Sequence, residues 1–363
     1  MHTWSTSRRS LSPAPSVASK GMWTVLIGRA PVALVVLLVL VIGTGHGVTR
    51  AAAGQRLQRG AVDRLYAADS PFNQKIPAGA KIDARSAQLV NSVVEVGRKQ
   101  GFLIALKRWT IPVYFADRNT PRYRVRLKAR WAPARWFEGV PIPTGAAPDP
   151  ANDAHMVIID TDSGCEYDFW QIKKNKRGRW KASWGNSLRT DGDGIFPKGL
   201  SARGSGFALP AGMIWPEELA AGRIEHALQF SYNYPKKGGP VSPATESDGT
   251  SSRNDAIPEG ARLQLDPTLE LDGLGLRPYE RIIAEALQQY GMFLADHGGG
   301  VELQAVHPLS YQDNPYDGLL PDRKYVYLDN IPLDRLQVLE LPAQIKDPGE
   351  QIVQSGCGKL IKR

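Results

Sequence analysis

The chain has 363 residues, of which 42% are hydrophobic and 22% are charged. This composition is typical of globular proteins and excludes a disordered or fibrous chain. The net charge is +9, but five of the positive charges lie in residues 1–53, which contain no acidic residue. The rest of the chain is only mildly basic, so we expect no nucleic-acid partner.

The N-terminal region contains one uninterrupted apolar segment. Residues 30–45 read APVALVVLLVLVIGTG, with Arg29 before the run and the small residues Ala51 to Ala53 after it. A cationic stretch, an apolar run and small residues in this order indicate a signal peptide. The run is short for a spanning helix, which needs about 20 apolar residues. We therefore expect residues 1–53 to be a cleaved signal peptide or a retained signal anchor.

Either fate places the rest of the chain outside the cytoplasmic membrane. The protein would be secreted, or anchored to the outer face of that membrane and in contact with it only through the N-terminal segment. Composition then predicts a polar stalk over residues 54–69, one β-rich globular domain over residues 70–345 and a basic C-terminal tail over residues 346–363.

Most of the predicted domain reads as short strands. An amphipathic helix is expected over residues 86–100, and a second helix over 277–290, with Pro278 in its first turn and Gly291 just past its end. Between Pro, Gly, Asn and Asp clusters, β-type runs occur at 102–106, 111–115, 123–127, 156–160, 167–172, 179–184, 226–230, 262–265 and 292–296. This pattern predicts a mainly β fold, a jelly-roll or concanavalin-like sandwich with a few peripheral helices.

One strand carries two acidic residues on the same face. In CEYDFW, from Cys165 to Trp170, a period of two puts Glu166, Asp168 and Trp170 together and opposite the apolar face. Residues two apart on a strand are roughly 6.6 Å apart, near the spacing of the paired carboxylates of glycosidases. An indole in the same row would stack on a sugar ring. The alternative is a solvated acidic face on an edge strand.

A hairpin from Trp170 to Trp184 would extend this face. If the two indoles share one side, they form an aromatic platform beside the acids; the alternative is core packing. The connecting segment contains Lys173, Lys174, Lys176, Arg177 and Arg179. These cations suit an anionic glycan or a teichoic-type polymer, or they keep a hairpin tip solvated.

Histidine is scarce after residue 53. His155 precedes the strand at 156–160, and His226 shares an apolar face with Leu228, which fits either a core residue or a general acid or base. Asp248 and Asp296 lie beside glycines in SDG and LADHGG, where a carboxylate can reach a cleft. Two histidines with Asp248 or Asp296 would make a metal site, but no recognised metal-ligand spacing supports one, so we expect no metal and no cofactor.

The two cysteines both follow the leader. In an oxidising compartment Cys165 and Cys357 can form a disulfide that joins the C-terminal tail to the domain. Alternatively, Cys165 is a small core residue and Cys357 is a free thiol.

A set of phrases resembles a group of exported microbial β-sandwich proteins without an assigned activity. The phrases are HMVIID at His155, EYDFW at Glu166, the long FALPAGMIWPEELAAGRIEHALQF at Phe207, SDG at Ser247, ARLQLDP at Ala261 and YGMFLADHGG at Tyr290. The resemblance covers roughly residues 70–341 and implies a secreted sandwich of the kind found among polysaccharide-acting enzymes. It also places His155, Asp168, His226, Asp248 and Asp296 in recurring motifs.

These observations lead to an expected function. We expect a glycoside hydrolase acting on a cell-envelope or extracellular polysaccharide, with Asp168 and either Glu166 or Asp248 as the acid/base pair. His226 would transfer or orient a proton, and His155, Trp170, Trp184 and Asp296 would bind substrate. A polysaccharide lyase is one alternative. A non-catalytic glycan-binding or envelope-scaffold protein is another.

Overall fold

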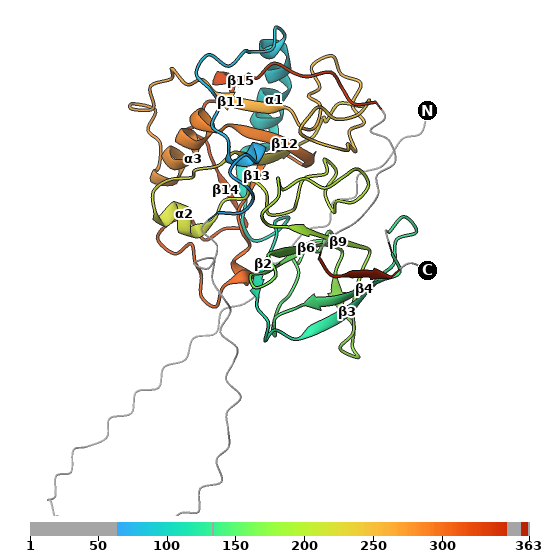
Figure 1. The fold of residues 1–363 in the computed structure, drawn as a ribbon. Helices are drawn as coiled ribbons and strands as arrows, with labels where there is room; N and C mark the ends of the chain where they lie inside the picture. Colours follow the sequence, from blue (N-terminus) through green and yellow to red (C-terminus); the bar gives the residue numbers. More distant parts are fainter. Residues whose placement is uncertain (1–63, 133, 347–356, 362–363) are drawn as a thin grey trace, which may run out of the picture. The chain divides into compact units, whose positions relative to one another are not determined.

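The computed structural model describes residues 64–132, 134–346 and 357–361. The predicted leader, residues 1–53, lies outside these ranges. The described chain is mainly β, as predicted, with its strands in three mixed sheets and with three α-helices (Figure 1). None of the described helices is both long and apolar enough to cross a bilayer.

The largest sheet has seven strands in the order β14-β1-β13-β10-β12-β11-β15. It mixes parallel pairs, such as β10 with β12, and antiparallel pairs, such as β11 with β12. Its strands are β1 (Phe102–Ala105), β10 (Leu228–Tyr232), β11 (Arg262–Leu265), β12 (Met292–His297), β13 (Val301–Gln304), β14 (Tyr325–Tyr327) and β15 (Leu336–Val338).

Two helices cover one face of this sheet. Helix α1 (Ser86–Gln100) has the predicted bounds and buries Leu89, Val93 and Val96 against the sheet, because these residues recur every three or four positions. Helix α3 (Pro278–Gln289) begins with proline at its first position, and the chain turns at Gly291, where φ is +67°. The short helix α2 (Pro216–Ala220) and the 3₁₀ turns Pro71–Asn73, Pro308–Ser310 and Leu333–Arg335 complete the helical elements.

Two smaller sheets form further layers. The four-stranded sheet has the order β2-β5-β6-β9, with strands β2 (Val113–Ala116), β5 (Met156–Asp160), β6 (Cys165–Trp170) and β9 (Trp184–Arg189). The five-stranded sheet has the order β16-β4-β3-β8-β7, with strands β3 (Arg122–Leu127), β4 (Trp136–Pro141), β7 (Lys173–Lys174), β8 (Trp180–Ala182) and β16 (Lys359–Ile361).

Alternation along the strands explains how these layers pack. Met292 and Leu294 of β12 join the helices in one core, whereas Phe293 joins Val113 and Val157 of the four-stranded sheet in a second core. The opposite face of the four-stranded sheet packs on the five-stranded sheet in a third core. The four-stranded sheet is therefore buried on both faces. The side chains of β6 from Cys165 to Phe169 therefore lie in the interior, and Trp170 at its end is half-buried.

The segment just before the predicted domain boundary also belongs to the packed structure. Leu65 and Tyr66 are buried in the second core, although the sequence analysis assigned them to a polar stalk. The side chain of Asn73 donates to the carbonyls of Leu65 and Ala67 and so holds this segment in place. Residues 64–69 are thus part of the domain.

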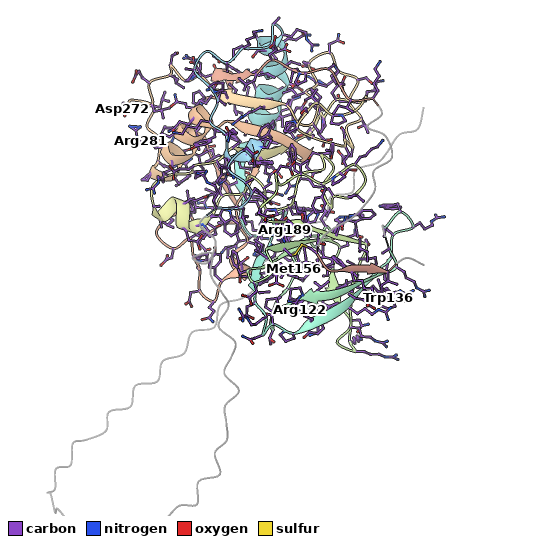
Figure 2. The ribbon with its side chains drawn as sticks, viewed as in Figure 1. Arg122, Trp136, Met156, Arg189, Asp272 and Arg281 are labelled. Atoms are coloured by element: carbon purple, nitrogen blue, oxygen red, sulfur yellow. A yellow bond between two sulfur atoms is a disulfide. The ribbon has the colours of Figure 1, made fainter. Side chains whose placement is uncertain are left out.

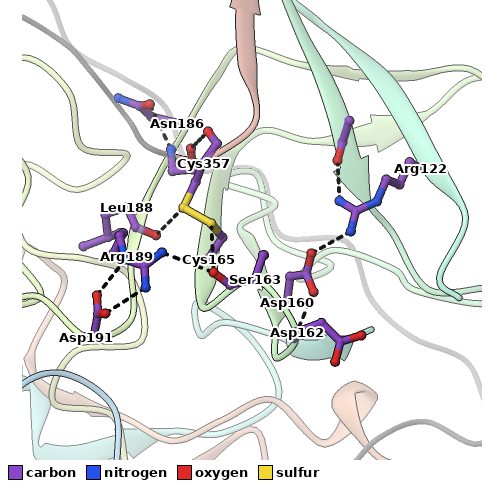
Figure 3. Close-up of a disulfide and its surroundings, with 12 residues drawn as sticks. Arg122, Asp160, Asp162, Ser163, Cys165, Asn186, Leu188, Arg189, Asp191 and Cys357 are labelled. Atoms are coloured by element: carbon purple, nitrogen blue, oxygen red, sulfur yellow. Dashed lines mark hydrogen bonds and ion pairs between the residues drawn. A yellow bond between two sulfur atoms is a disulfide. The ribbon is translucent and has the colours of Figure 1, made fainter. Parts of the chain in front are cut away.

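A disulfide joins the end of the chain to the four-stranded sheet. Cys165 of β6 and Cys357 are bonded, with 5.7 Å between their Cα atoms (Figure 3). Strand β16 follows directly and pairs with β4. The bond closes a loop across 192 positions, for which the chain-entropy model gives about 5 kcal/mol of stabilisation.

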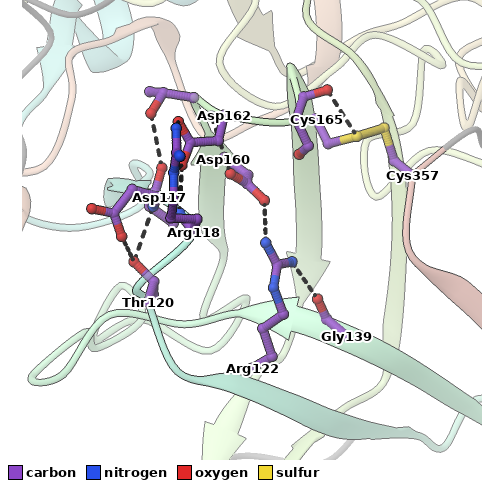
Figure 4. A network of polar contacts seen from close by, with 12 residues as sticks. Asp117, Arg118, Thr120, Arg122, Gly139, Asp160, Asp162, Cys165 and Cys357 are labelled. Atoms are coloured by element: carbon purple, nitrogen blue, oxygen red, sulfur yellow. Dashed lines mark hydrogen bonds and ion pairs between the residues drawn. A yellow bond between two sulfur atoms is a disulfide. The ribbon is translucent and has the colours of Figure 1, made fainter.

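An ion pair between a buried aspartate and an exposed arginine links two of the sheets. Asp160, at the end of β5, is fully buried and accepts a hydrogen bond of 2.8 Å from the Arg122 guanidinium on β3 (Figure 4). The same guanidinium donates to the carbonyl of Gly139, at 3.0 Å. Because both partners are hydrogen-bonded, the Asp160 charge is compensated inside the structure.

Candidate functional site

Arg203 lies at the centre of a cluster of ionisable side chains between the seven-stranded and four-stranded sheets. Its side chain is 4% exposed, and it donates to Gln229 Oε1 at 2.7 Å, to the Leu209 carbonyl at 2.8 Å and to Gln304 Oε1 at 3.1 Å. Gln229 is on β10 and Gln304 is on β13, and each alternates with residues of the first core. Both amides therefore point toward the four-stranded sheet. They fix the guanidinium there.

The loop that carries Arg203 is held by side-chain hydrogen bonds. The carboxylate of Glu246 accepts from the backbone amides of Gly199 and Ser201, and Ser201 Oγ accepts from the Arg203 amide at 2.9 Å. The next residue is Gly204, where a Cβ atom would lie 2.9 Å from Cγ of Asp248. Glycine at this position lets the Asp248 carboxylate approach the backbone next to Arg203.

A sealed carboxyl pair lies on one side of Arg203. Glu166 and Asp168 of β6 are both 0% exposed. Tyr66 donates its hydroxyl to Glu166 Oε2 at 2.9 Å, and the Leu209 amide donates to Asp168 Oδ2 at 2.7 Å. We name Glu166 and Asp168 the sealed pair.

Burial keeps a proton in the sealed pair. Burial and the neighbouring Asp168 raise the pKa of Glu166 well above its usual range, while burial, opposed by hydrogen bonds and by Arg203, raises the pKa of Asp168 to about 6. The remaining oxygens, Glu166 Oε1 and Asp168 Oδ1, have no other partner among the described residues. One proton shared between the two carboxyls satisfies both oxygens.

Three more carboxylates gather on the other side of Arg203. Asp248 lies in an irregular loop, Glu259 precedes β11, and Asp296 lies near the end of β12. One oxygen from each lies within 4.8 Å of the others. Asp248 is exposed, Asp296 is half-buried and Glu259 is fully buried, so this group reaches solvent. We name these three residues the open cluster.

Burial and mutual repulsion raise two pKa values in the open cluster. Burial first, and then the charge of Asp248, raise the pKa of Asp296 to about 7, although Arg203 opposes the rise. Burial and Asp248 likewise raise the pKa of Glu259 to about 9. The carboxylate of Glu259 also accepts from the Asp248 amide at 3.0 Å. The cluster therefore combines an exposed acid with two partners that hold protons near neutral pH.

The open cluster also has the donor set of a cation site. Carboxylate oxygens are the ligands that Ca²⁺ and Mg²⁺ prefer. Among the described residues these three are the group of His, Cys, Asp and Glu whose donor atoms lie close enough to share one ion. The neighbouring Arg203 guanidinium interacts electrostatically with both Asp296 and Glu259.

Three residues near the cluster provide polar and aromatic groups. His155 Nε2 is buried and without a partner in the described chain, and burial lowers the pKa of this histidine to about 4. The charges of Asp153 and Arg203 act on this pKa in opposite directions. The indole of Trp170 donates to Asp153 Oδ1 at 3.1 Å. A neutral imidazole and a half-buried indole therefore lie on the β6 side of the site.

The two tryptophans predicted as a platform lie opposite each other. Trp170 pairs with Trp184 across β6 and β9, so both side chains are on one face. Trp184 is only 5% exposed, whereas Trp170 is half-buried. Of the pair, Trp170 is the indole with surface to offer a ligand.

His226 belongs to a different region from the open cluster. It precedes β10 and is half-buried, and its Nε2 lies 3.1 Å from Glu218 while its Nδ1 lies 3.0 Å from the Ala227 carbonyl. Both ring nitrogens thus face acceptors. It lines a cavity of about 260 Å³ with Glu217 and Tyr66, and no member of the open cluster lines that cavity.

The structure gathers part of the predicted site and adds new members. Asp168, Asp248, Asp296 and His155 surround Arg203, but Asp168 and Glu166 have no solvent access. Sequence reasoning missed Arg203, Glu259 and the Tyr66 hydroxyl. The available signals were the glycine-rich GSGF after Arg203 and the PEG turn at Glu259. Neither motif reveals a partner that is distant in sequence.

Comparisons of the chain with protein-family models, with curated proteins and with solved structures find no significant match.

Proposed function

We propose that the protein is an exported glycoside hydrolase acting on a cell-envelope or extracellular polysaccharide, with Asp296 as general acid and Asp248 as nucleophile. The observation that carries this proposal is the open cluster. It places an exposed carboxylate within 4.8 Å of a carboxyl whose pKa is raised to about 7. Glycoside hydrolysis needs two carboxyl groups in different protonation states, flanking one bond.

The two carboxyls would act in turn. Asp296 donates its proton to the glycosidic oxygen while the Asp248 carboxylate attacks the anomeric carbon, so the bond from that carbon to oxygen breaks and an alcohol leaves. The Asp296 carboxylate then removes a proton from water, and the water oxygen displaces Asp248 from the sugar. Both residues return to their starting protonation states.

The separation favours retention of anomeric configuration. Retaining enzymes hold their carboxyls about 5 to 5.5 Å apart, and inverting enzymes about 6.5 to 9.5 Å apart to admit a water molecule. One oxygen of Asp248 lies within 4.8 Å of one oxygen of Asp296, an approach that fits the first arrangement better than the second.

The neighbouring groups have supporting roles in this scheme. Glu259, with a pKa of about 9, stays protonated and positions Asp248 through the Asp248 amide without adding negative charge. Arg203 limits the rise of the Asp296 pKa, so that the acid can lose its proton within the catalytic cycle. Trp170 offers an indole face for sugar stacking, and the neutral, buried imidazole of His155 lies on the same side of the site.

The test is digestion of a panel of polysaccharides by the purified protein and by three isosteric variants. Asp248→Asn and Asp296→Asn should each lower turnover by about 10²- to 10⁴-fold. Asp313→Asn is the matched control, because Asp313 is an exposed loop residue. It should keep wild-type turnover. Unchanged turnover in both cluster variants would refute the assignment.

Product analysis separates the remaining alternatives. A retained anomeric configuration in the first product, read by NMR, supports Asp248 as nucleophile, whereas inversion contradicts that role. A product with a new carbon–carbon double bond, seen by its ultraviolet absorbance, would indicate a polysaccharide lyase. Binding of a glycan without any cleavage would favour a glycan-binding or scaffold protein.

A further inference from the structure

The outer face of the five-stranded sheet carries unpaired positive charge. Val125 and Leu127 of β3 point into the third core, so the alternate residue Arg126 points outward, and it is exposed. Lys128, just past β3, and Lys173, on β7, are also exposed, and Lys181 on β8 is half-buried. We name Arg126, Lys128, Lys173 and Lys181 the basic face. Trp136 of β4, which is labelled in Figure 2, lies opposite Arg126 in the sheet.

The strand register brings these cations into one row. Arg126 lies directly opposite Lys181, and Lys181 lies directly opposite Lys173. Neighbouring strands are about 4.8 Å apart, and like charges directly opposite each other destabilise a sheet. The side chains respond to this crowding, because the charge of Lys181, followed by weaker effects of Lys173 and Arg126, lowers the pKa of Lys128.

No acid in the described chain relieves the crowding. The ion pairs of the described residues include none of the four cations. Glu138, on the neighbouring strand β4, is already paired with Arg124 at 2.8 Å. The hairpin between β7 and β8 adds the exposed cations Lys176, Arg177 and Arg179. The positive charge is therefore concentrated and not paired with acids in the described chain, although the Arg126 guanidinium carbon lies 6.0 Å from the centroid of the Trp136 ring.

Protection of a sheet edge does not explain this arrangement. Lysines on edge strands prevent pairing between molecules, and this accounts for Lys173 on the edge strand β7. Arg126 and Lys181, however, lie on the interior strands β3 and β8, where no edge needs protection. A bound polyanion would remove the repulsion between them.

The aromatic groups near the basic face indicate which polyanion fits. Single-stranded nucleic acids bind to open aromatic rings on which their bases stack. Here Arg124 covers Trp136, with its guanidinium carbon 4.1 Å from the ring centroid, and Trp180 is only 5% exposed. One open ring is close to the face in sequence, Trp131, which lies three residues past Lys128 and is 69% exposed. A single ring beside a row of cations is too few for the successive base stacking of a single-stranded nucleic acid, and the row suits a chain of regularly spaced carboxylates.

We propose that the basic face binds an acidic polysaccharide through the carboxylates of successive sugar units. The choice of a glycan rests on the proposed function, whereas the requirement for a polyanion rests on the basic face alone. The row spans three adjacent strands, so a polymer engages several cations at once and a single small anion engages one.

The experiment compares binding of the full-length protein to polygalacturonate and to uncharged dextran. The test variant is Lys128→Gln/Lys173→Gln, since both residues are exposed and tolerate the change. The control is Lys237→Gln/Lys324→Gln, which removes the same charge from exposed positions elsewhere. We expect binding to polygalacturonate alone, weakened about tenfold or more in the test variant and unchanged in the control, and falling steeply with added salt.

Two results would overturn the proposal. One is equal binding of polygalacturonate by the test and control variants. Melting curves of both variants check that each is folded. The other is tighter binding to a short DNA duplex than to polygalacturonate at equal charge. Asp296→Asn, which tests the proposed hydrolysis, should bind polygalacturonate as the wild type does. A failure of catalysis is therefore distinguishable from a failure of this surface.

Discussion

Two acidic groups flank Arg203, and they differ in their access to solvent. The sealed pair, Glu166 and Asp168, is fully buried and bonded to Tyr66 and to a backbone amide. The open cluster includes the exposed Asp248 and the half-buried Asp296. Both groups contain carboxyls with raised pKa values. A raised pKa alone therefore does not identify a catalytic acid.

The difference assigns separate roles to the two groups. A substrate cannot reach the sealed pair without displacement of Tyr66 or the loop at Leu209, so its shared proton stabilises the interior. The open cluster also holds carboxyls with raised pKa values, but it is accessible to solvent. Arg203 is coupled to Asp168 on one side and to Asp296 on the other, and thus one guanidinium serves both.

The largest expected difference is in catalysis. Asp296→Asn should lower turnover by about 10²- to 10⁴-fold, because the acid that protonates the leaving group is lost. Asp168→Asn should keep at least about a tenth of wild-type turnover, because its remaining oxygen can still accept from the Leu209 amide. Steady-state kinetics on the same polysaccharide checks both. Equal losses in the two variants would mean that the sealed pair takes part in the reaction, as the sequence first suggested.

Loss of the central cation should destabilise the protein strongly. Arg203→Met removes hydrogen bonds to Gln229, Gln304 and the Leu209 carbonyl and leaves the surrounding acids without a counter-charge. We expect the free energy of unfolding to fall by about 3–5 kcal/mol. Urea denaturation measures this change. Arg203→Lys keeps the charge but loses the planar geometry, so its free energy of unfolding should lie between those of the wild type and Arg203→Met. A loss below about 1 kcal/mol in Arg203→Met would contradict the shared role of Arg203.

The fold was more predictable than the site. The bounds of α1 and the positions of nine of the described strands follow from local periodicity. The alternation in β6 correctly separates Glu166 and Asp168 from Tyr167 and Phe169. Alternation does not reveal that a second sheet covers the polar face. The sealed pair was therefore predicted to meet substrate, although it is buried between two layers.

Arg203 and Glu259 illustrate what local patterns omit. Both lie in irregular segments without a period, and each gains its role from residues distant in sequence, such as Gln304 for Arg203. Asp248 and Asp296 were identified because they lie next to glycines. Their mutual approach depends on the fold of the whole domain. Short or partly polar strands carry weak patterns, and this explains why the sequence analysis missed β4, β7, β9, β13, β14, β15 and β16.

The pH dependence of stability should reflect the open cluster. The pKa values of Asp296 and Glu259 are raised to about 7 and about 9 in the folded state, so the folded protein binds more protons than the unfolded chain above pH 4. Their contribution to stability is therefore complete below pH 4 and is lost as pH rises through 7 and toward 9. The melting temperature should be lower at pH 8 than at pH 5. Asp296→Asn should reduce this difference, and an unchanged difference would show that Asp296 does not titrate in this range.

The smallest expected effect concerns the hydrogen bond from Tyr66 to the sealed pair. Tyr66→Phe keeps the ring against Gly194 but removes the hydroxyl that donates to Glu166 Oε2. The free energy of unfolding should fall by about 1–2 kcal/mol, since a buried acceptor loses its partner. Turnover per folded molecule should stay within about twofold of wild type, because the open cluster lies on the other side of Arg203. Chemical denaturation and kinetics on the same sample separate the two quantities. A loss of turnover without a loss of stability would link the sealed pair to catalysis through Arg203.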